Sequence, residues 1–244
     1  MSCVRIAMWS GPRNISTAMM RAWENRADVR VWDEPLYPLW LHRTGADHPG
    51  REHVLHEQAG DLEEPFLLQQ LAEASSDADI FYMKHMAHHL LPGLSDDWLR
   101  DTRHAFLIRD PQRVLASLAQ KVPAAGIEDT GLPQQVALLR TLGERGYPSP
   151  PVIDSDDVLA APDVVLKSLC TQLAVPFDPA MLSWPAGSRP SDGSWGDWWY
   201  EQVRKSTGFG PSRENDSALP SQQRAILPAC MELYEELAAL RISL

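Results

Sequence analysis

Short apolar runs alternate along this chain with segments whose apolar residues recur at helical spacing. The runs predict buried β-strands, because they are short and end at turn-forming or charged residues. They span residues 4–8, 29–32, 80–84, 105–109 and, as a candidate fifth strand, 152–154. Helical spacing predicts amphipathic helices over residues 16–25, 111–120, 164–173 and 222–240. Alternation of strands and helices predicts an α/β fold with a parallel sheet.

The length of 244 residues favours one domain, 1–244, with insertions. The segment from about 37 to 77 has weak periodicity until a short apolar run at 66–68. It also contains four histidines among glycine, proline and acidic residues. We therefore expect residues 37–77 to form a variable cap over the functional site. The chain contains no internal repeat or low-complexity tract, and nothing in it indicates an oligomeric state.

The charge, hydropathy and cysteine content of the chain argue against several classes of function. The net charge of -11 argues against nonspecific binding to nucleic acid, so any phosphate pocket must be locally basic. No apolar run approaches the roughly 20 residues that cross a bilayer, and the N-terminus lacks the features of a signal peptide. We therefore expect a cytoplasmic protein. Cys3, Cys170 and Cys230 lack paired metal spacing and are expected to be reduced packing residues.

The segment Ser-Gly-Pro-Arg-Asn-Ile-Ser-Thr at 10–17 joins the first predicted strand to the first predicted helix. Phosphate oxygens need convergent N–H donors, a positive charge and a close backbone, which a glycine turn opening a helix supplies. Gly11, Arg13, Ser16 and Thr17 meet these needs. The loop lacks the Gly-Lys-Ser/Thr ending of a Walker A motif, which disfavours an ATPase or an ordinary kinase. A purely structural turn is the alternative interpretation of the loop taken alone.

A second motif, Leu-Ile-Arg-Asp-Pro-Gln-Arg-Val-Leu-Ala-Ser, lies at 107–117. Arg109 at a strand end and Ser117 two turns into the next helix can converge on one phosphate. Together, the two segments resemble the nucleotide-binding motifs of the sulfotransferase family, whose bacterial members often carry arginine at the position of Arg13. The resemblance implies a P-loop three-layer fold with a central parallel sheet flanked by helices. It also implies sulfuryl transfer from 3′-phosphoadenosine 5′-phosphosulfate (PAPS).

The resemblance assigns roles to individual residues. It implies that the 5′-phosphosulfate is held by Gly11, Pro12, Arg13, Asn14, Ile15, Ser16 and Thr17. Arg109 and Ser117 correspond to the family's ligands of the 3′-phosphate. Residues 152–162 resemble the family's strand, acidic turn and helix. Arg204, Lys205 and Ser206 resemble its Arg-Lys-Gly segment, which closes over the adenosine, although Ser206 replaces the glycine.

Transfer to an alcohol or amine needs a base for the acceptor's proton and positive charge at the departing phosphate oxygen. Arg13 is the candidate for the positive charge. Glu34 follows the second predicted strand, where several sulfotransferases place a catalytic glutamate, and parallel sheets carry their sites at strand carboxyl ends. His85 is the second candidate base, because Lys84-His85-Met86 resembles the family's Lys-Thr-His segment with an offset of one residue. A turn acid and an ordinary polar histidine are the corresponding structural interpretations.

The leading hypothesis is thus a PAPS-dependent enzyme that acts on a small-molecule acceptor and needs no metal. His85, His88 and His89 have a spacing that permits metal ligation, but no carboxylate or cysteine cluster supports it. Two alternatives stay open. A kinase-like phosphotransferase would depend on ATP and magnesium, and a non-catalytic nucleotide-binding module would bind the nucleotide without turnover. The tryptophan-rich segment 195–200 is left without an assigned role.

Overall fold

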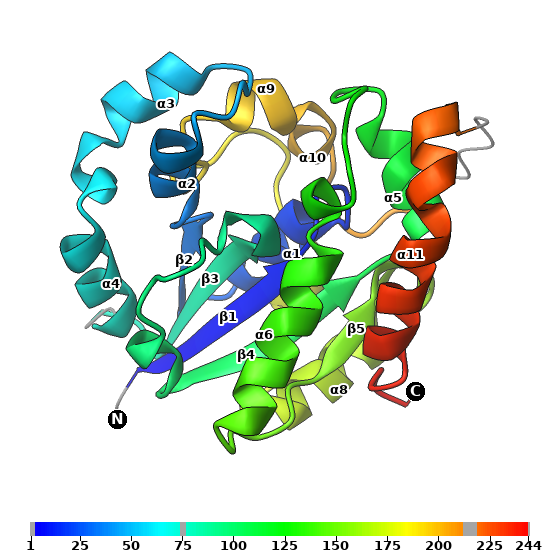
Figure 1. Cartoon of the computed structure of the whole chain (residues 1–244). Coiled ribbons are helices and arrows are strands. Elements are labelled where there is room, and N and C mark those ends of the chain that lie inside the picture. The colour runs from blue at the N-terminus through cyan, green and yellow to red at the C-terminus, as the bar shows by residue number, and fades with distance from the viewer. Residues whose placement is uncertain (1–2, 74–76, 212–218, 244) are drawn as a thin grey trace.

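The computed structural model describes residues 3–73, 77–211 and 219–243 (Figure 1). Within them, five parallel strands form one sheet in the order β2-β3-β1-β4-β5. The strands are β1 (Val4–Ser10), β2 (Val29–Asp33), β3 (Ile80–Met86), β4 (Thr102–Ile108) and β5 (Val152–Asp154). The parallel α/β fold predicted from the sequence is therefore confirmed.

Helices flank the sheet and extend beyond the carboxyl ends of its strands (Figure 1). The α-helices are α1 (Ser16–Glu24), α2 (Tyr37–Thr44), α3 (Arg51–Glu57), α4 (Glu64–Ala72), α5 (Pro111–Leu118), α6 (Leu132–Glu144), α7 (Ser155–Ala160), α8 (Pro162–Gln172), α9 (Gly196–Trp199), α10 (Glu201–Arg204) and α11 (Ser221–Ala238). Short 3-10 helices are η1 (Ala59–Leu62), η2 (Ala87–His89), η3 (Asp97–Leu99), η4 (Glu128–Thr130) and η5 (Pro179–Leu182). None of these described helices is long and apolar enough to cross a bilayer.

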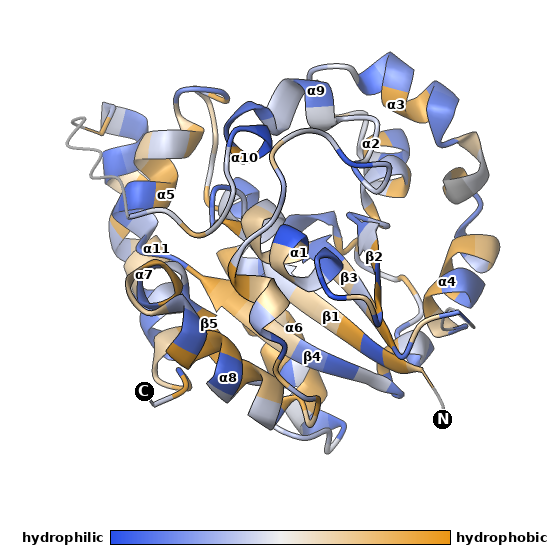
Figure 2. Cartoon of the chain, turned by 180° about the vertical axis from the view of Figure 1, so that it is seen from behind, coloured by the Kyte–Doolittle hydropathy of each residue, from blue (hydrophilic) through white to orange (hydrophobic). Residues whose placement is uncertain are grey.

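The two faces of the sheet bury two separate apolar cores, because successive strand side chains point to opposite faces. On β1, Ile6 and Met8 belong to the core beneath α1 and α8, the face toward the viewer in Figure 2. Trp9 belongs to the opposite core, with α4, α5, α6 and α11. Strands buried on both faces are expected to be largely apolar. Figure 2 shows apolar stretches in the strands that are interrupted by polar positions, as in β4.

The cap expected at 37–77 contains α2, α3, η1 and α4, while its residues 74–76 lie outside the described part of the chain. Tyr37 and Leu41 of α2 and Val54 of α3 form a third, smaller core with Trp195 and Tyr200. The cap is thereby packed against a segment about 150 residues later in the chain. This contact places both segments beyond the carboxyl ends of β2 and β3 (Figure 1).

Candidate active site

The loop between β1 and α1, residues 11–15, has a backbone that few sequences can adopt. Arg13 and Ile15 have positive φ angles of 64° and 57°. A Cβ at Gly11 would lie 2.0 Å from the carbonyl oxygen of Thr130, so only glycine fits there. Ile15, the N-cap of α1, supplies no side-chain cap, and the first amides of a helix have no acceptor within it. The loop therefore presents N–H donors at a positive helix end, as phosphate binding requires.

Three hydrogen bonds to two later segments, residues 107–109 and Ser155, hold this loop in place. The Asn14 amide donates to the carbonyl of Leu107 at 3.2 Å, and the Ser155 hydroxyl donates to the carbonyl of Asn14 at 3.0 Å. Arg109 Nη1 donates to the carbonyl of Arg13 at 2.7 Å. The loop and the second motif, predicted from distant stretches of sequence, are thus brought together at the ends of β1 and β4.

Arg13 and Arg109 form a concentrated positive region. Arg13 Nε donates to Ser117 Oγ at 2.8 Å, and Arg109 donates to the Arg13 carbonyl. Hydrogen bonds thus connect the three predicted phosphate ligands Arg13, Arg109 and Ser117. Burial lowers the pKa of both guanidinium groups, and Arg109 lowers that of Arg13 further. Neither arginine forms a salt bridge within residues 3–73, 77–211 and 219–243. Both side chains are half-buried, and although Asp156, Asp154 and Asp110 raise the pKa of Arg109, partly desolvated cations without a salt bridge are costly, so this region suits a bound anion.

A second polar cluster lies at the carboxyl ends of β2 and β3. Lys84 Nζ, fully buried, donates to Asp33 Oδ1 at 2.8 Å, to Glu34 Oε1 at 2.5 Å and to the Tyr200 hydroxyl at 2.8 Å. Tyr200 in turn donates to Asp33 Oδ2 at 2.6 Å, and Trp195 Nε1 lies 3.0 Å from the Tyr200 oxygen. We call Asp33, Glu34, Lys84 and Tyr200 the carboxylate–lysine cluster.

Glu34 combines an unusual backbone with a perturbed carboxyl group. Its φ angle is 42°, a conformation that costs a residue with a side chain of order 1 kcal/mol or more. Hydrogen bonds from its N–H to Lys84 O and from Tyr37 N–H to its carbonyl hold that conformation. Burial raises the pKa of Glu34, and Asp33 raises it too, while Lys84 opposes them. A carboxylate of increased basicity is suited to accept a proton near neutral pH.

His85 points to the opposite face of the sheet from the cluster. Its ring stacks on Trp9 at a centroid distance of 4.3 Å and lies 5.5 Å from Trp98. The side chain is 1% exposed, and neither ring nitrogen has a hydrogen-bond partner. Burial, with contributions from His104 and Lys84, lowers the pKa of His85 to about 3. The structure thus places this candidate base inside an apolar core.

His89 takes a position next to Glu34 that the sequence interpretation did not assign to it. Its Nδ1 lies 3.7 Å from Glu34 Oε2, and its ring stacks on Tyr37 at a centroid distance of 4.6 Å. His88 packs edge-on against His89 at 4.2 Å. In the part of the chain that the structure describes, no group of three or more histidine, cysteine or acidic side chains is arranged to hold a metal.

The third predicted motif lies on α10 and just after it. Arg204 pairs with Asp197 at 2.7 Å, and Lys205 pairs with Glu201 at 2.8 Å. The Ser206 hydroxyl accepts from Trp184 Nε1 at 3.1 Å. The partners of the motif thus all lie within residues 184–201. Tyr200, which belongs to the same stretch, is part of the carboxylate–lysine cluster.

Three parts of the site were missed by sequence reasoning: Asp33, Tyr200 and the turn at Thr130 and Gly131. Asp33 pairs in register with Lys84 across β2 and β3, so adjacent strand ends of opposite charge were a usable signal. Tyr200 carried no such signal, because its partners lie more than a hundred positions away. The turn at Thr130 and Gly131, which packs on Gly11, was missed for the same reason.

Comparison with known proteins gives one family. A family model described as a sulfotransferase domain matches residues 4–241. Two curated Arabidopsis thaliana proteins, branched-chain-amino-acid aminotransferase-like proteins 2 and 1, are 34% and 35% identical over 229 residues. These matches cover 94% of this chain and 40% of each relative. The chain thus spans about two fifths of the length of these curated relatives.

Solved structures share the fold. The sulfotransferase domain of the Synechococcus PCC 7002 olefin synthase superposes with a TM-score of 0.55 at 18% identity, covering 94% of this chain and 95% of that one. The sulfotransferase domain from the curacin biosynthetic pathway gives 0.50 at 14%, covering 94% and 98%. A sulfotransferase from Alicyclobacillus acidocaldarius gives 0.50 at 11%, covering 100% and 98%. At sequence identities of 18% or less, the similarity to these structures shows a shared fold and nothing more.

Proposed function

Because this chain belongs to the sulfotransferase domain family, we propose that it transfers a sulfuryl group from PAPS to a hydroxyl or amine of a small molecule. The observation that carries the proposal is the pair of half-buried arginines, Arg13 and Arg109, which form no salt bridge among the described residues. PAPS is a donor with anionic groups at both ends of its adenosine. It would supply the activated sulfuryl group.

The residues present fit such a donor at two places. Arg13, Ser16, Thr17 and the N–H groups of the loop would hold the 5′-phosphosulfate. Arg109 and Ser117 would hold the 3′-phosphate, which is the feature that separates PAPS from ATP. The short bond from Arg13 to Ser117 would then be exchanged for bonds to phosphate oxygens, at a gain in charge pairing.

Glu34 is proposed as the base. It directly follows β2, and two strand spacings, roughly 10 Å in total, separate β2 from β1 in this sheet. An acceptor hydroxyl lying between them would give its proton to Glu34, which Lys84 and Tyr200 hold in place. Arg13 and the loop N–H groups would balance negative charge on the departing phosphate oxygen. His85, inside the core, has no such access.

Calorimetric titration with adenosine 3′,5′-bisphosphate and with ADP tests the donor assignment. We expect the bisphosphate to bind more tightly than ADP. Arg109→Ala should weaken bisphosphate binding by about 10- to 100-fold, the value of a charge-assisted hydrogen bond, and should weaken ADP binding less, through loss of the bond from Arg109 to the Arg13 carbonyl alone. Arg100→Ala, which removes an exposed arginine before β4, is the matched control.

Equal affinities for the two ligands, or an Arg109→Ala variant that binds both normally, would overturn the proposal. Magnesium-dependent binding of ATP without preference for a 3′-phosphate would indicate a kinase-like phosphotransferase instead. Tight binding of the bisphosphate without turnover of PAPS by any acceptor would indicate a non-catalytic module.

A further inference from the structure

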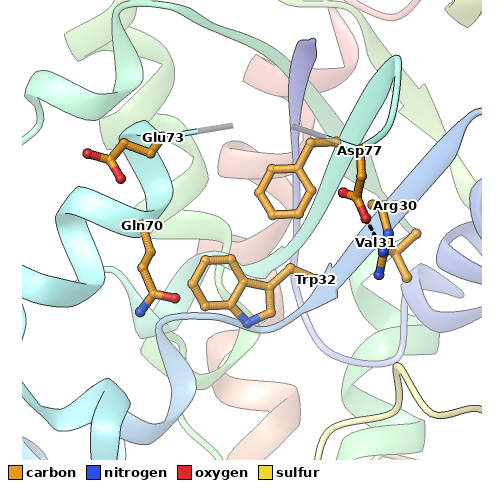
Figure 3. A pocket seen from close by; sticks show the side chains of 7 residues that line it. Arg30, Val31, Trp32, Gln70, Glu73 and Asp77 are labelled. Atoms are coloured by element: carbon orange, nitrogen blue, oxygen red, sulfur yellow. Dashed lines mark hydrogen bonds and ion pairs between the residues drawn. The ribbon is translucent and has the colours of Figure 1, made fainter. Parts of the chain in front are cut away.

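A cavity of about 400 Å³ lies between α2, residues 88–92 and the start of α6. We call it the α2–α6 pocket; its lining residues include Trp40, His88, Leu91, Glu128, Asp129 and Gln134. A second cavity of similar volume lies between β2 and α4 (Figure 3). There Arg30 is paired with Asp77, and none of the lining residues belongs to the candidate site.

The α2–α6 pocket is next to both halves of the site. Trp40 and His88 line it, and both rings contact His89, at centroid distances of 4.8 Å and 4.2 Å. His89 Nδ1 in turn lies 3.7 Å from Glu34 Oε2. On the other side, the turn that joins η4 to α6 packs against Gly11 of the glycine loop. One residue, His89, therefore separates a molecule in this pocket from Glu34, the proposed base.

The polar atoms of the pocket are chiefly hydrogen-bond acceptors. Glu128 and Asp129 contribute two carboxylates, and no lysine or arginine is among the described lining residues. Gln134 donates through Nε2 to Glu128, while its Oε1 is buried and accepts no hydrogen bond from the described residues. His88 Nδ1 is also buried without a partner in the described part of the chain. Burial lowers the pKa of His88 to about 3, so this ring contributes no compensating positive charge.

The rest of the pocket is apolar. Leu90, Leu91 and Pro92 form one wall, and Pro133 and Ala137 of α6 form another. Trp40 adds an aromatic ring, which attracts cations through its π face. An occupant that fits needs an apolar body to cover these walls and a positively charged donor group for the acceptor atoms.

We infer that the α2–α6 pocket selects, as sulfuryl acceptor, an apolar or aromatic alcohol that carries an ammonium group. The inference rests on the proposed function. The ammonium would lie by Glu128 and Asp129, and the apolar body would cover the leucines and Trp40. Carboxylates keep the nitrogen protonated and hence without a lone pair, so the nucleophile is the hydroxyl.

The reaction is then balanced without a further reagent. The acceptor oxygen forms a bond to sulfur as the bond from sulfur to the phosphate oxygen breaks. The hydroxyl proton passes to Glu34 by way of the His89 ring, which separates the pocket from that carboxylate, and the electron pair of the broken bond stays with the phosphate. The products are a sulfate ester that retains its ammonium group and adenosine 3′,5′-bisphosphate.

Three phenols of similar size test this inference: tyramine, which is cationic, para-ethylphenol, which is neutral, and para-hydroxyphenylpropionate, which is anionic. Binding to the whole chain is measured by calorimetry in the presence of adenosine 3′,5′-bisphosphate, and turnover is measured with PAPS. We expect affinity to fall by about tenfold from cation to neutral phenol and again from neutral phenol to anion. The specificity constants for turnover should follow the same order.

The double variant Glu128→Gln, Asp129→Asn should remove most of this discrimination while leaving bisphosphate binding unchanged. Glu232→Gln, Glu235→Gln, which neutralises two exposed acids on α11, makes the same change in net charge and should keep the discrimination. Equal binding of the three phenols, no binding of any of them, or unchanged discrimination in the pocket variant would overturn the inference. Failure of the proposed function is a separate result, namely loss of the preference for the bisphosphate over ADP.

Discussion

At the carboxyl ends of β1 and β4, two half-buried arginines lie without a salt bridge to any described residue, whereas at the ends of β2 and β3 one buried lysine is bonded to two carboxylates. Both regions concentrate charge away from water, which costs free energy. In the carboxylate–lysine cluster the folded chain itself offsets that cost. In the arginine region Asp156, Asp154 and Asp110 offset the cost only in part, because burial still lowers the pKa of Arg109, and a bound anion would offset the rest. We therefore infer that the arginine region binds an anion and that the carboxylate–lysine cluster positions a base.

Of the two regions, the carboxylate–lysine cluster should give the largest effect on activity when its proposed base is changed. Glu34→Gln removes the proton acceptor but keeps the size and much of the hydrogen bonding of the side chain. We expect kcat to fall by about 10²- to 10⁴-fold, the usual contribution of a general base, with bisphosphate affinity unchanged. Steady-state kinetics and calorimetry measure the two quantities, and Glu73→Gln on the exposed end of α4 is the control. A variant with normal kcat would exclude Glu34 as the base.

Breaking the paired cluster should give the largest effect on stability. Lys84→Met leaves Asp33 and Glu34 buried without their cation, so we expect the free energy of unfolding to fall by about 3–5 kcal/mol. Lys167→Met, which breaks an exposed pair with Asp163, should cost at most about 1 kcal/mol. Urea denaturation compares them. Similar losses in the two variants would mean that the cluster is not the stabilising unit described here.

The pH dependence of turnover reports the basicity of Glu34. Only its ionised form accepts a proton, so the rate should rise with pH through the pKa of Glu34, which burial raises above the ordinary glutamate value. The hydrogen bond from Tyr200 lowers that pKa. Tyr200→Phe should therefore move the acidic limb of the profile to higher pH. A limb that stays in place in this variant would mean that another group controls it.

The smallest effect is expected on the opposite face of the sheet. His85→Phe replaces one stacked ring between Trp9 and Trp98 by another, so kcat should stay within about twofold of its original value and the free energy of unfolding within roughly 1.5 kcal/mol. Kinetics and thermal unfolding measure these changes. A loss of activity as large as that of Glu34→Gln would make His85 the base.

Local sequence patterns predicted most of the sheet and helices, but not every boundary. The fourth strand was predicted from Ala105, whereas β4 begins at Thr102. The polar residue His104 interrupts the apolar pattern there, although its ring is buried and accepts a hydrogen bond from Trp9. Helix α6, which packs Gln135 beneath the glycine loop, was not predicted. Buried polar residues that are satisfied by distant partners cannot be distinguished from exposed ones by local periodicity.

The sequence by itself determined the glycine loop, the arginine that follows each of two strands, the order of the five strands, and the helices α1, α5, α8 and α11. These features depend on contiguous residues, and their physical causes, turn geometry and side-chain periodicity, act over a few positions. Only the tertiary structure decided that Glu34 lies with Lys84 and Tyr200 while His85 faces an apolar core. Strand register and the packing of a distant segment bring these side chains together, and both arise from contacts between residues far apart in the chain.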